Sequence, residues 1–566
     1  MARSDVEEGS PGPGQVRIVF LGGLGEIGRN CFCLEVEGRI LVVDCGLMFP
    51  EADMPGVDLV LPDFTYLRDH ADRVEAVLLT HGHEDHTGGL AFLLRDVAVP
   101  IYGTPLTLAL ARNRIEEAGV LGRTELVPIQ DHERRRIGPF DCEFVPVTHS
   151  VPHGLATAFH TPVGTILHTG DFKLDLTPVD GRTTDLAMLG EIARRPGGVR
   201  LLLSDSTNAE RPGYTPSESV VGGVMRGLFR EHAGRRFVVA SFASHLHRVK
   251  QVAEAAVASG RRVAFLGRSM VQNAALARSM GLLELPADAV VDVEEIATLD
   301  PGELCIVCTG SQGEPMSALS LMAAHEHKWV KLDEDDVVVI SAHAIPGNEG
   351  NVNRVIDALY RIGVEVIHDR NAPVHVSGHA SQEELKFVLN LIRPDWFVPV
   401  HGEFRHMVHH AQLAHDVGVA AGRVVVCQDG DALVLDADGV TVERAAVPAG
   451  YLYVDGIVGD IGHGVLRDRR ALAEEGVVVV IATVDAKTGE IVTGPEIVTR
   501  GWIYAPEAEE LLGEAKARVL ASLQEAAGEG ATDFETLRRH ARSALARFIN
   551  ERTRRRPIVI PVVMEV

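Results

Sequence analysis

Residues 74–89 read VEAVLLTHGHEDHTGG, and this stretch decides the fold that we expect. The apolar run VEAVLLT is followed within six residues by three imidazoles and a carboxylate, at His81, His83, Asp85 and His86. An apolar run that ends in a polar loop is typical of a buried strand whose end carries functional side chains. Because imidazoles and carboxylates this close together bind divalent cations, the stretch predicts a metal site at the end of a strand.

Further His and Asp residues follow apolar runs elsewhere in the chain. His149 lies in FVPVTHS, Asp171 ends ILHTGD and His401 lies in FVPVHGE. Because the ends of neighbouring strands meet at one edge of a sheet, we expect these side chains to join the first cluster in a single site. Seven candidate ligands are more than one tetrahedral zinc can use, so the arithmetic favours two metals that share Asp171.

Length and composition indicate a large folded protein. A chain of 566 residues corresponds to about three or four domains. Its 46% hydrophobic and 23% charged residues exclude a mainly disordered or fibrous chain. The net charge of −25 repels polyanions on average, so nucleic-acid binding must depend on local basic patches or on metal ions.

The cysteines and the first residues predict a cytoplasmic location. Seven cysteines is an odd number, and most of them lie in apolar runs, as expected of reduced thiols rather than a disulfide framework. The opening MARSDVEEGSPGPG has acids, Pro and Gly where a signal peptide needs a basic start and an apolar stretch. No later run reaches about 18 consecutive apolar residues, so we expect no contact with a membrane.

The order of apolar patterns predicts an α/β chain with an insertion. Strands and helices alternate to about residue 210, as in a layered α/β domain, and a parallel-sheet pattern then begins near ERPGYTPSES. Short strands resume near residue 365. The expected parts are a disordered tail (1–15), the first part of an α/β domain (16–214), an inserted α/β domain (215–365), the second part of the first domain (366–460), a linker (461–475) and a small C-terminal α/β domain (476–566).

Two motifs suggest other chemistry. GGLGEIG (22–28) has the spacing of a dinucleotide-binding loop, and Asp44 lies near the offset of a ribose-binding acid. The following IGRNCFCLEV has no helical face, so we interpret the loop as a turn between strands. Cys305 and Cys308 in CIVC have redox or zinc spacing, but a single pair inside a strand-like run predicts buried thiols.

The H-x-H-x-D-H motif, with its downstream His and Asp, resembles the metallo-β-lactamase superfamily, whose fold is an αββα sandwich. Asp44 in ILVVDCG is similar to that family's first motif, which orients the metal ligands. Asp205 in LLLSDSTNAE, His379 in HVSGHAS and His401 resemble the three motifs of the β-CASP nucleases, which carry an inserted domain. GGLGEIGRN, SFASHLHR, GSQGEPMSAL and RRRPIVIPVVMEV extend the likeness to the bacterial ribonuclease J family, over residues 16–566.

The resemblance implies two divalent transition-metal ions, zinc or manganese. It assigns the first ion to His81, His83 and His149, the second to Asp85, His86 and His401, and Asp171 to both. It also implies that Asp85, Asp205 and His379 are catalytic: Asp205 orients His379, which stabilises the pentavalent phosphorus or protonates the leaving 3′ oxygen. The two metals would activate a hydroxide for attack on the scissile phosphate.

The candidate substrate-binding residues lie in two short motifs. They are His375, Ser377, Gly378, His379, Ser244 and His245. The HVSGH turn offers a hydroxyl, a Gly amide and two imidazoles as a phosphate cradle, although an ordinary Ser/Gly turn remains the alternative. SFASHLHR begins a helix, whose free N–H groups attract phosphate, so it is a candidate site for the 5′-terminal nucleotide. A His at the third motif accompanies RNA-directed members of the family, so His401 favours RNA.

The resemblance further implies a structural calcium ion and partner molecules. The calcium ligands would be the Gly56 carbonyl, Asp58 and Asp455, whose oxygens suit a hard cation. The implied substrate is RNA with a 5′-monophosphate. A homodimer or higher homo-oligomer, with the C-terminal domain as the contact, and an RNA-decay complex are the implied assemblies.

The leading hypothesis is a ribonuclease that degrades RNA 5′→3′ from a 5′-monophosphate and also cleaves internally, in RNA maturation and decay. An endonuclease without exonuclease activity and a DNA-directed β-CASP nuclease are alternatives. A small-molecule hydrolase is disfavoured because the inserted domain would cover an open site. A scaffold protein without metals is disfavoured because all seven ligands are present.

Overall fold

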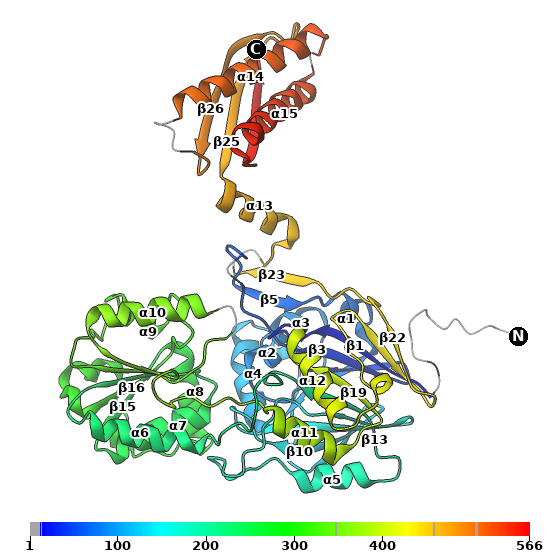
Figure 1. The fold of residues 1–566 in the computed structure, drawn as a ribbon, viewed down its shortest axis with the longest axis vertical. Coiled ribbons are helices and arrows are strands. Elements are labelled where there is room, and N and C mark those ends of the chain that lie inside the picture. Colours follow the sequence, from blue (N-terminus) through cyan, green and yellow to red (C-terminus); the bar gives the residue numbers. More distant parts are fainter. Residues whose placement is uncertain are drawn as a thin grey trace, which may run out of the picture. The chain divides into compact units, whose positions relative to one another are not determined.

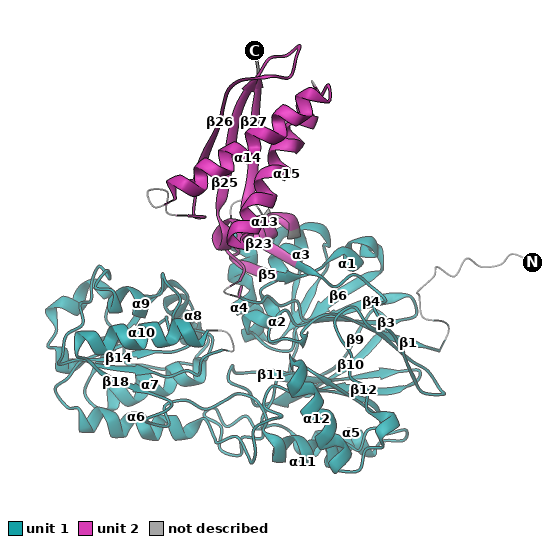
Figure 2. Cartoon of the chain, turned by 45° about the horizontal axis from the view of Figure 1, so that its top comes forward, with its two compact units in different colours: residues 1–49, 61–451 teal, residues 50–60, 452–566 magenta. Residues whose placement is uncertain are grey.

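The computed structural model describes residues 12, 14–51, 53–345, 348–456, 459–503, 508–531 and 533–566. The predicted disordered tail therefore lies almost wholly outside the described residues. Contacts divide the chain into two compact units (Figure 2): residues 1–49 with 61–451, and residues 50–60 with 452–566. Sequence patterns did not predict this division, although the calcium site implied by the resemblance had placed Gly56 and Asp58 beside Asp455.

Two sheets form the sandwich of the first unit. The eight-stranded sheet has the order β22 (Val440–Glu443), β21 (Ala432–Leu435), β1 (Val16–Gly22), β3 (Cys31–Val36), β4 (Arg39–Val43), β6 (Val74–Leu78), β7 (Ile101–Gly103) and β8 (Leu126–Pro128). The six-stranded sheet has the order β19 (Trp396–Val400), β13 (Val199–Asp205), β12 (Gly164–His168), β11 (Gly154–Thr161), β10 (Phe140–Val147) and β9 (Arg134–Ile137). Ile18 and Phe32 of one sheet share a core with Phe144 and Leu203 of the other.

Helices cover the outer faces of both sheets (Figure 1). They are α1 (Thr65–Asp69), α3 (Leu90–Asp96) and α4 (Pro105–Glu117) on the eight-stranded sheet, and α5 (Leu186–Arg194), α11 (Gln382–Ile392) and α12 (Phe404–Asp416) on the six-stranded sheet. The apolar stripes of α5, α11 and α12 bury Leu189, Leu385 and Leu413 against that sheet. Removal of apolar area from water at about 25 cal/mol per Å² stabilises this stack. The αββα arrangement expected from the sequence is confirmed.

The inserted domain is a doubly wound parallel sheet. Its strands follow the order β15 (Arg262–Leu266), β16 (Leu304–Cys308), β14 (Phe237–Ala240), β17 (Val337–Ile340) and β18 (Glu365–His368). One face packs on α6 (Ser219–Glu231), α7 (Leu246–Ala258) and α8 (Arg268–Ser279), and the other on α9 (Ala318–Ala323) and α10 (Glu349–Ile362). A sheet covered on both faces explains the continuous Val- and Ile-rich runs that predicted it.

The second unit ends in a two-layered α/β domain. Its sheet has the order β26 (Ile491–Arg500), β25 (Val477–Val484) and β27 (Ile558–Glu565). Alternate residues of β25, such as Val478 and Val480, pack on α14 (Glu509–Gly528) and α15 (Phe534–Thr553). The unit also contains β23 (Tyr451–Asp455) apart from its first residue, β24 (Gly459–Asp460) and the first half of β5 (Leu59–Pro62). The expected linker, residues 461–475, forms helix α13 (Gly462–Glu475).

The GGLGEIG loop is a turn, and no helix follows it. Strand β2 (Leu24–Gly25) pairs with β20 (Gly402–Glu403), directly after His401, and the chain then enters β3. A Cβ on Gly22 would lie 2.2 Å from the carbonyl oxygen of Arg29, so the tight return needs glycine there. The loop therefore lies against the strand end that carries His401, and it does not open a nucleotide-binding helix.

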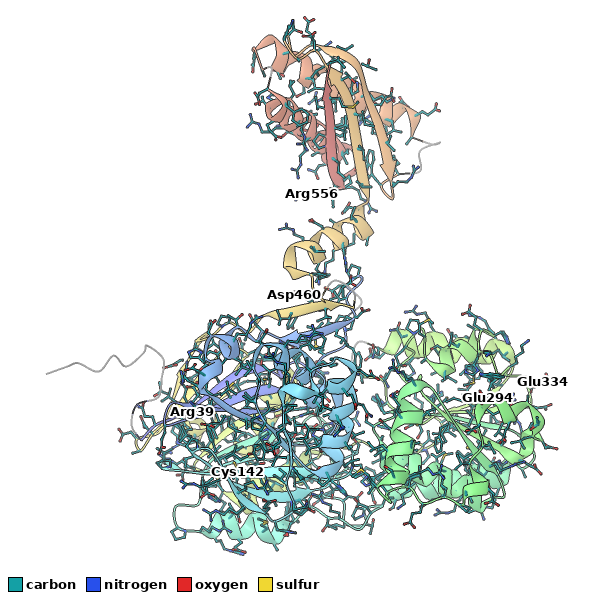
Figure 3. The ribbon with its side chains drawn as sticks, turned by 180° about the vertical axis from the view of Figure 1, so that it is seen from behind. Arg39, Cys142, Glu294, Glu334, Asp460 and Arg556 are labelled. Atoms are coloured by element: carbon teal, nitrogen blue, oxygen red, sulfur yellow. The ribbon has the colours of Figure 1, made fainter. Side chains whose placement is uncertain are left out.

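The remaining short elements are α2 (Glu84–Thr87), η1 (Ala71–Arg73), η2 (Leu121–Arg123), η3 (Ala287–Ala289), η4 (Val293–Thr298), η5 (Pro301–Glu303) and η6 (Ala421–Arg423). All seven cysteines are buried free thiols, including Cys305 and Cys308 in β16. Figure 3 shows Cys142 inside the sandwich. Within the described residues, no helix has both the length and the apolarity needed to cross a bilayer.

Candidate metal centre

The ends of several strands deliver seven His and Asp side chains to one point. The loop after β6 carries His81 and His83, and α2 carries Asp85 and His86. His149, Asp171 and His401 follow β10, β12 and β19. Their ligand atoms form two groups, each within 4.8 Å, and Asp171 belongs to both. The structure thus brings together all seven residues that the sequence predicted as ligands.

The first group has the spacing of a tetrahedral ligand set. His83 Nδ1 lies 3.1 Å from His81 Nε2 and 3.1 Å from His149 Nε2. Asp171 Oδ2 lies 3.5 Å from His81 Nε2 and 3.8 Å from His149 Nε2. Two ligands of a tetrahedral zinc at about 2.0–2.1 Å are separated by about 3.4 Å, so these four atoms fit one ion.

The second group has the same spacing around the same Asp171 oxygen. Asp171 Oδ2 lies 3.3 Å from His86 Nε2 and 3.4 Å from His401 Nε2. Asp85 Oδ2 lies 3.5 Å from each of these nitrogens. The buried His401 Nε2 has no hydrogen-bond partner although it points into the cluster. An orphaned imidazole nitrogen beside two carboxylates suits a cation.

Charge at the cluster is tuned by burial and by close neighbours. Burial lowers the pKa of His83 to about 4 and holds the pKa values of His81 and His149 well below the ordinary value, so these imidazoles are neutral at pH 7, as metal binding requires. Burial opposes the charge of Asp171, but nearby imidazoles, chiefly His401, outweigh it and hold the Asp171 pKa well below its usual range. For His401, burial opposes the positive charge, but the Asp171, Asp85 and Asp205 carboxylates together outweigh burial and raise the pKa to about 9. A bound cation would displace that proton.

Asp44 lies behind the metal ligands. Its Oδ2 accepts hydrogen bonds from His86 Nδ1 at 2.7 Å and from the Thr80 hydroxyl at 2.8 Å. Asp44 and His401 both have left-handed backbone conformations, with φ values of 59° and 54°. Such conformations cost about 1–3 kcal/mol in a non-glycine residue and concentrate at functional sites.

The predicted catalytic pair and the HVSGH turn lie beside the metal cluster. His379 Nδ1 donates to Asp205 Oδ2 at 2.8 Å, and the His379 ring lies 4.8 Å from the His149 ring. The Gly378 carbonyl accepts from His149 Nδ1 at 2.8 Å. The Ser377 hydroxyl accepts from Asn208 Nδ2 at 2.8 Å. The turn is thus joined directly to His149, a predicted metal ligand.

The predicted residues in and next to the inserted domain lie differently. The buried His245 precedes α7, and its Nε2 lies 3.5 Å from Glu218 Oε2. His375 lies close to the buried Arg248 guanidinium, 3.4 Å from His375 Nδ1 to Arg248 Nη1. Ser244 is half-buried. The His245 imidazole therefore points to a carboxylate of its own domain.

The predicted calcium ligands lie together in the second unit, and an arginine contacts two of them. Arg469 Nη1 donates to the Gly56 carbonyl at 2.7 Å, and Arg469 Nη2 pairs with Asp455 Oδ2 at 2.7 Å. Asp58 Oδ2 accepts from the Gly456 amide at 2.7 Å. The calcium ion stays a prediction, since a guanidinium already supplies positive charge at these oxygens.

Sequence reasoning missed the amides and hydroxyls that hold the ligands. Asn30 Nδ2 donates to the main-chain oxygen of Asp85 at 3.1 Å, and Ser150 Oγ lies 3.3 Å from His83 Nε2. Asn30 lies in GGLGEIGRN, and Ser150 follows His149, so proximity to known motifs was the signal available. Asn208, on the same grounds, follows Asp205 by three residues.

The fold and this ligand geometry define a metal-dependent hydrolase of the metallo-β-lactamase type. Family models match residues 24–213 (metallo-beta-lactamase superfamily), 234–359 (Ribonuclease J, beta-CASP domain), 363–426 (Zn-dependent metallo-hydrolase RNA specificity domain) and 464–566 (Ribonuclease J C-terminal domain). These matches cover both the sandwich and its insertion, as the resemblance implied.

Named relatives identify the family within this class of hydrolases. The chain is 41% identical to "Ribonuclease J2" of Bacillus subtilis, over 97% of this chain and 99% of that protein. It is 42% identical to "Ribonuclease J" of Thermus thermophilus, over 99% and 97%. The chain belongs to the ribonuclease J family and is a metal-dependent hydrolase that acts as a nuclease. A solved structure from Enterococcus faecalis, 18% identical with a TM-score of 0.54, covers 74% of this chain and 100% of its own, and shares the fold.

Proposed function

We propose that this nuclease degrades RNA 5′→3′ from a 5′-monophosphate and also cleaves RNA internally, in cytoplasmic RNA maturation and decay. RNA is favoured by the names of the relatives and by the match to an RNA specificity domain. The observation that carries the proposal is the junction of cradle and metal cluster, in which Gly378 holds a metal ligand through its carbonyl. A phosphate in the HVSGH turn would lie close to the metals.

The chain's own residues suit hydrolysis of a phosphodiester. When bound, two divalent cations, zinc or manganese, would acidify water and stabilise charge on the phosphoryl oxygens. The Asp205 carboxylate fixes Nδ1 of His379, which leaves Nε2 to stabilise the phosphorus or protonate the leaving 3′ oxygen. Burial opposes charge on Asp205, but the His379 imidazole lowers the Asp205 pKa, so the orienting group is ionised. Asp85 contributes as a ligand of the second ion.

The hydroxyl of Ser377 is the group we assign to the 5′-phosphate. It accepts hydrogen bonds from Asn208 Nδ2 and, at 3.3 Å, from the main-chain amide of His379, so its own proton is left to donate. His375 and Gly378 line the same turn. We assign Ser244 and His245 to the 5′-terminal nucleotide, and the geometry of His245 favours Ser244 as the direct contact.

Cleavage of nucleic acids that differ in their 5′ end or in their sugar tests this proposal. We would compare 5′-monophosphorylated RNA, 5′-triphosphorylated RNA and single-stranded DNA at single-nucleotide resolution, with zinc or manganese added. Ser377→Ala removes a donor to a charged group worth about 1.5–3 kcal/mol. We therefore expect a roughly ten- to hundredfold loss of exonuclease rate on monophosphorylated RNA, with a smaller loss of internal cleavage.

The matched control is Ser279→Ala, at the exposed end of α8, where the hydroxyl binds only the Leu276 carbonyl. Unchanged rates in Ser377→Ala would remove Ser377 from the site. An equal fall of both activities would assign Ser377 to the scissile phosphate instead. Internal products alone, or preferred cleavage of DNA, would favour the endonuclease-only or DNA-directed alternative.

We also propose that the chain forms a homodimer or a higher homo-oligomer through the C-terminal domain, and that it joins an RNA-decay complex. The sheet face opposite α14 and α15 supports self-association, because Ile560, Val562 and Met564 are all more than a third exposed there. Exposed apolar patches of this kind mark interaction sites. Sedimentation velocity of Ile560→Ser with Val562→Ser should show a smaller species than the wild type.

A further inference from the structure

Two threonines lie between a buried carboxylate and a predicted metal ligand. Thr80 Oγ1 donates to Asp44 Oδ2 at 2.8 Å and lies 3.0 Å from His81 Nδ1. On the other side of the cluster, Thr207 Oγ1 donates to Asp205 Oδ1 at 2.7 Å and lies 2.6 Å from His401 Nδ1. The two arrangements have the same order: imidazole, hydroxyl, carboxylate.

The number of protons and lone pairs on each group decides which atom donates in each contact. A hydroxyl has one proton and two lone pairs, and an ionised carboxylate only accepts. Because each threonine gives its proton to the carboxylate, it can only accept from the imidazole, so Nδ1 carries the hydrogen. In the neutral ring the unprotonated nitrogen is then Nε2, which in His81 and His401 faces the shared Asp171 oxygen at 3.5 and 3.4 Å. A metal ligand needs that lone pair.

We propose that Thr80 and Thr207 are positioning residues for the metal ligands. Each hydroxyl donates to a carboxylate and accepts from a ring nitrogen. This pair of hydrogen bonds, which we call the relay, selects the ligand tautomer and fixes the ring orientation. The other three imidazoles obtain an outer contact in other ways: His86 from Asp44, His149 from the Gly378 carbonyl and His83 from Ser150 Oγ. The proposal rests on the metal-ligand roles assigned above.

Asp205 contacts both His379 and the hydroxyl of Thr207. Its Oδ2 accepts from His379, while its Oδ1 accepts from both the hydroxyl and the main-chain amide of Thr207. One carboxylate therefore orients the residue assigned to the leaving oxygen and, through the hydroxyl, a ligand of the second metal. Asp44 plays the matching part for the first metal, since its Oδ1 accepts from the Thr80 amide at 2.8 Å.

Metal binding by isosteric variants tests the relay. Thr207→Val and Thr80→Val keep the side-chain shape and remove the hydroxyl, whereas Thr207→Ser and Thr80→Ser keep the hydroxyl. Loss of an outer partner costs about 10–100-fold in metal affinity. After dialysis against a chelating buffer, we expect elemental analysis of the full chain to give two metals for the wild type and both Ser variants. We expect one metal for each Val variant, and none for the double Val variant.

Thr161→Val is the matched control, because its hydroxyl binds the Gly164 carbonyl at 2.7 Å at the far end of β11. Thermal melting checks folding, and Thr207→Ala provides a second variant without the hydroxyl. Val variants that retain both metals at wild-type affinity would overturn the relay. Equal metal loss in Ser and Val variants would also overturn it, because packing would then be the cause. A wild type without bound metal would instead refute the metal centre itself.

Discussion

Gly378→Ala is the sharpest test of the junction between the cradle and the metal cluster. A Cβ added to Gly378 would lie 2.7 Å from Cε1 and 2.8 Å from Nδ1 of His149, and 2.9 Å from Cβ of Ser150. Non-bonded carbon atoms prefer a separation of about 3.5–4.0 Å, so the turn and the imidazole must separate by about 1 Å. The hydrogen bond from His149 to the Gly378 carbonyl lies in the same place and would stretch with them.

That displacement is large for a metal ligand. Coordination distances are held to about ±0.2 Å, and a misplacement of about 1 Å can cost about a hundredfold in rate even when the mutated residue does not take part in the chemistry. We therefore expect Gly378→Ala to lose about a hundredfold in RNA cleavage and to bind the metal of the His149 group more weakly, while it folds like the wild type.

The assay combines cleavage rates on one monophosphorylated RNA with elemental analysis of the purified chain. The matched control is Gly227→Ala in α6, where an added Cβ meets nothing within 4 Å. This control should keep full activity and gain up to about 1 kcal/mol of stability, since alanine favours a helix interior. Full activity and two bound metals in Gly378→Ala would refute the proposed contact between the turn and His149.

Three further predictions follow from named contacts. His83→Ala or Asp171→Ala should abolish RNA cleavage without unfolding the chain, because each removes a ligand; full activity in either variant, at normal melting temperature, would contradict the two-metal site. Arg469→Ala frees the oxygens of Gly56 and Asp455, so calcium should raise the melting temperature of this variant more than that of the wild type; equal shifts would remove Arg469 from that role. Burial lowers the pKa of His410 to about 3, whereas a histidine in the unfolded chain has a pKa of about 6.5. Between these pH values the unfolded chain binds more protons, so the free energy of unfolding falls with falling pH by up to about 1.4 kcal/mol per pH unit. In His410→Gln, urea unfolding should therefore give a free energy that depends less on pH between pH 7 and 5. An equal pH dependence in both proteins would contradict this.

Local patterns in the sequence predicted much of this protein. Apolar runs followed by polar residues marked the strands, and THGHEDHTGG with His149, Asp171 and His401 marked side chains that the structure brings together in one cluster. The lack of a helical face after GGLGEIG correctly argued against a nucleotide fold, and CIVC correctly indicated buried thiols. These inferences succeed because alternation, helical spacing and ligand clusters are properties of neighbouring residues.

Contacts between distant residues were decided only by the tertiary structure. Thr207 meets His401 across 194 residues, and Gly378 meets His149 across 229. Arg469 donates to the Gly56 carbonyl across 413 residues, at oxygens where the family resemblance had implied only a calcium ion. No local pattern encodes such pairs, because a hydroxyl, a carbonyl or a guanidinium has the same sequence signal wherever its partner lies. The pairing of Asp205 in β13 with Val400 in β19 places Thr207 beside His401, so the fold itself decides which nitrogen of that imidazole faces the cluster.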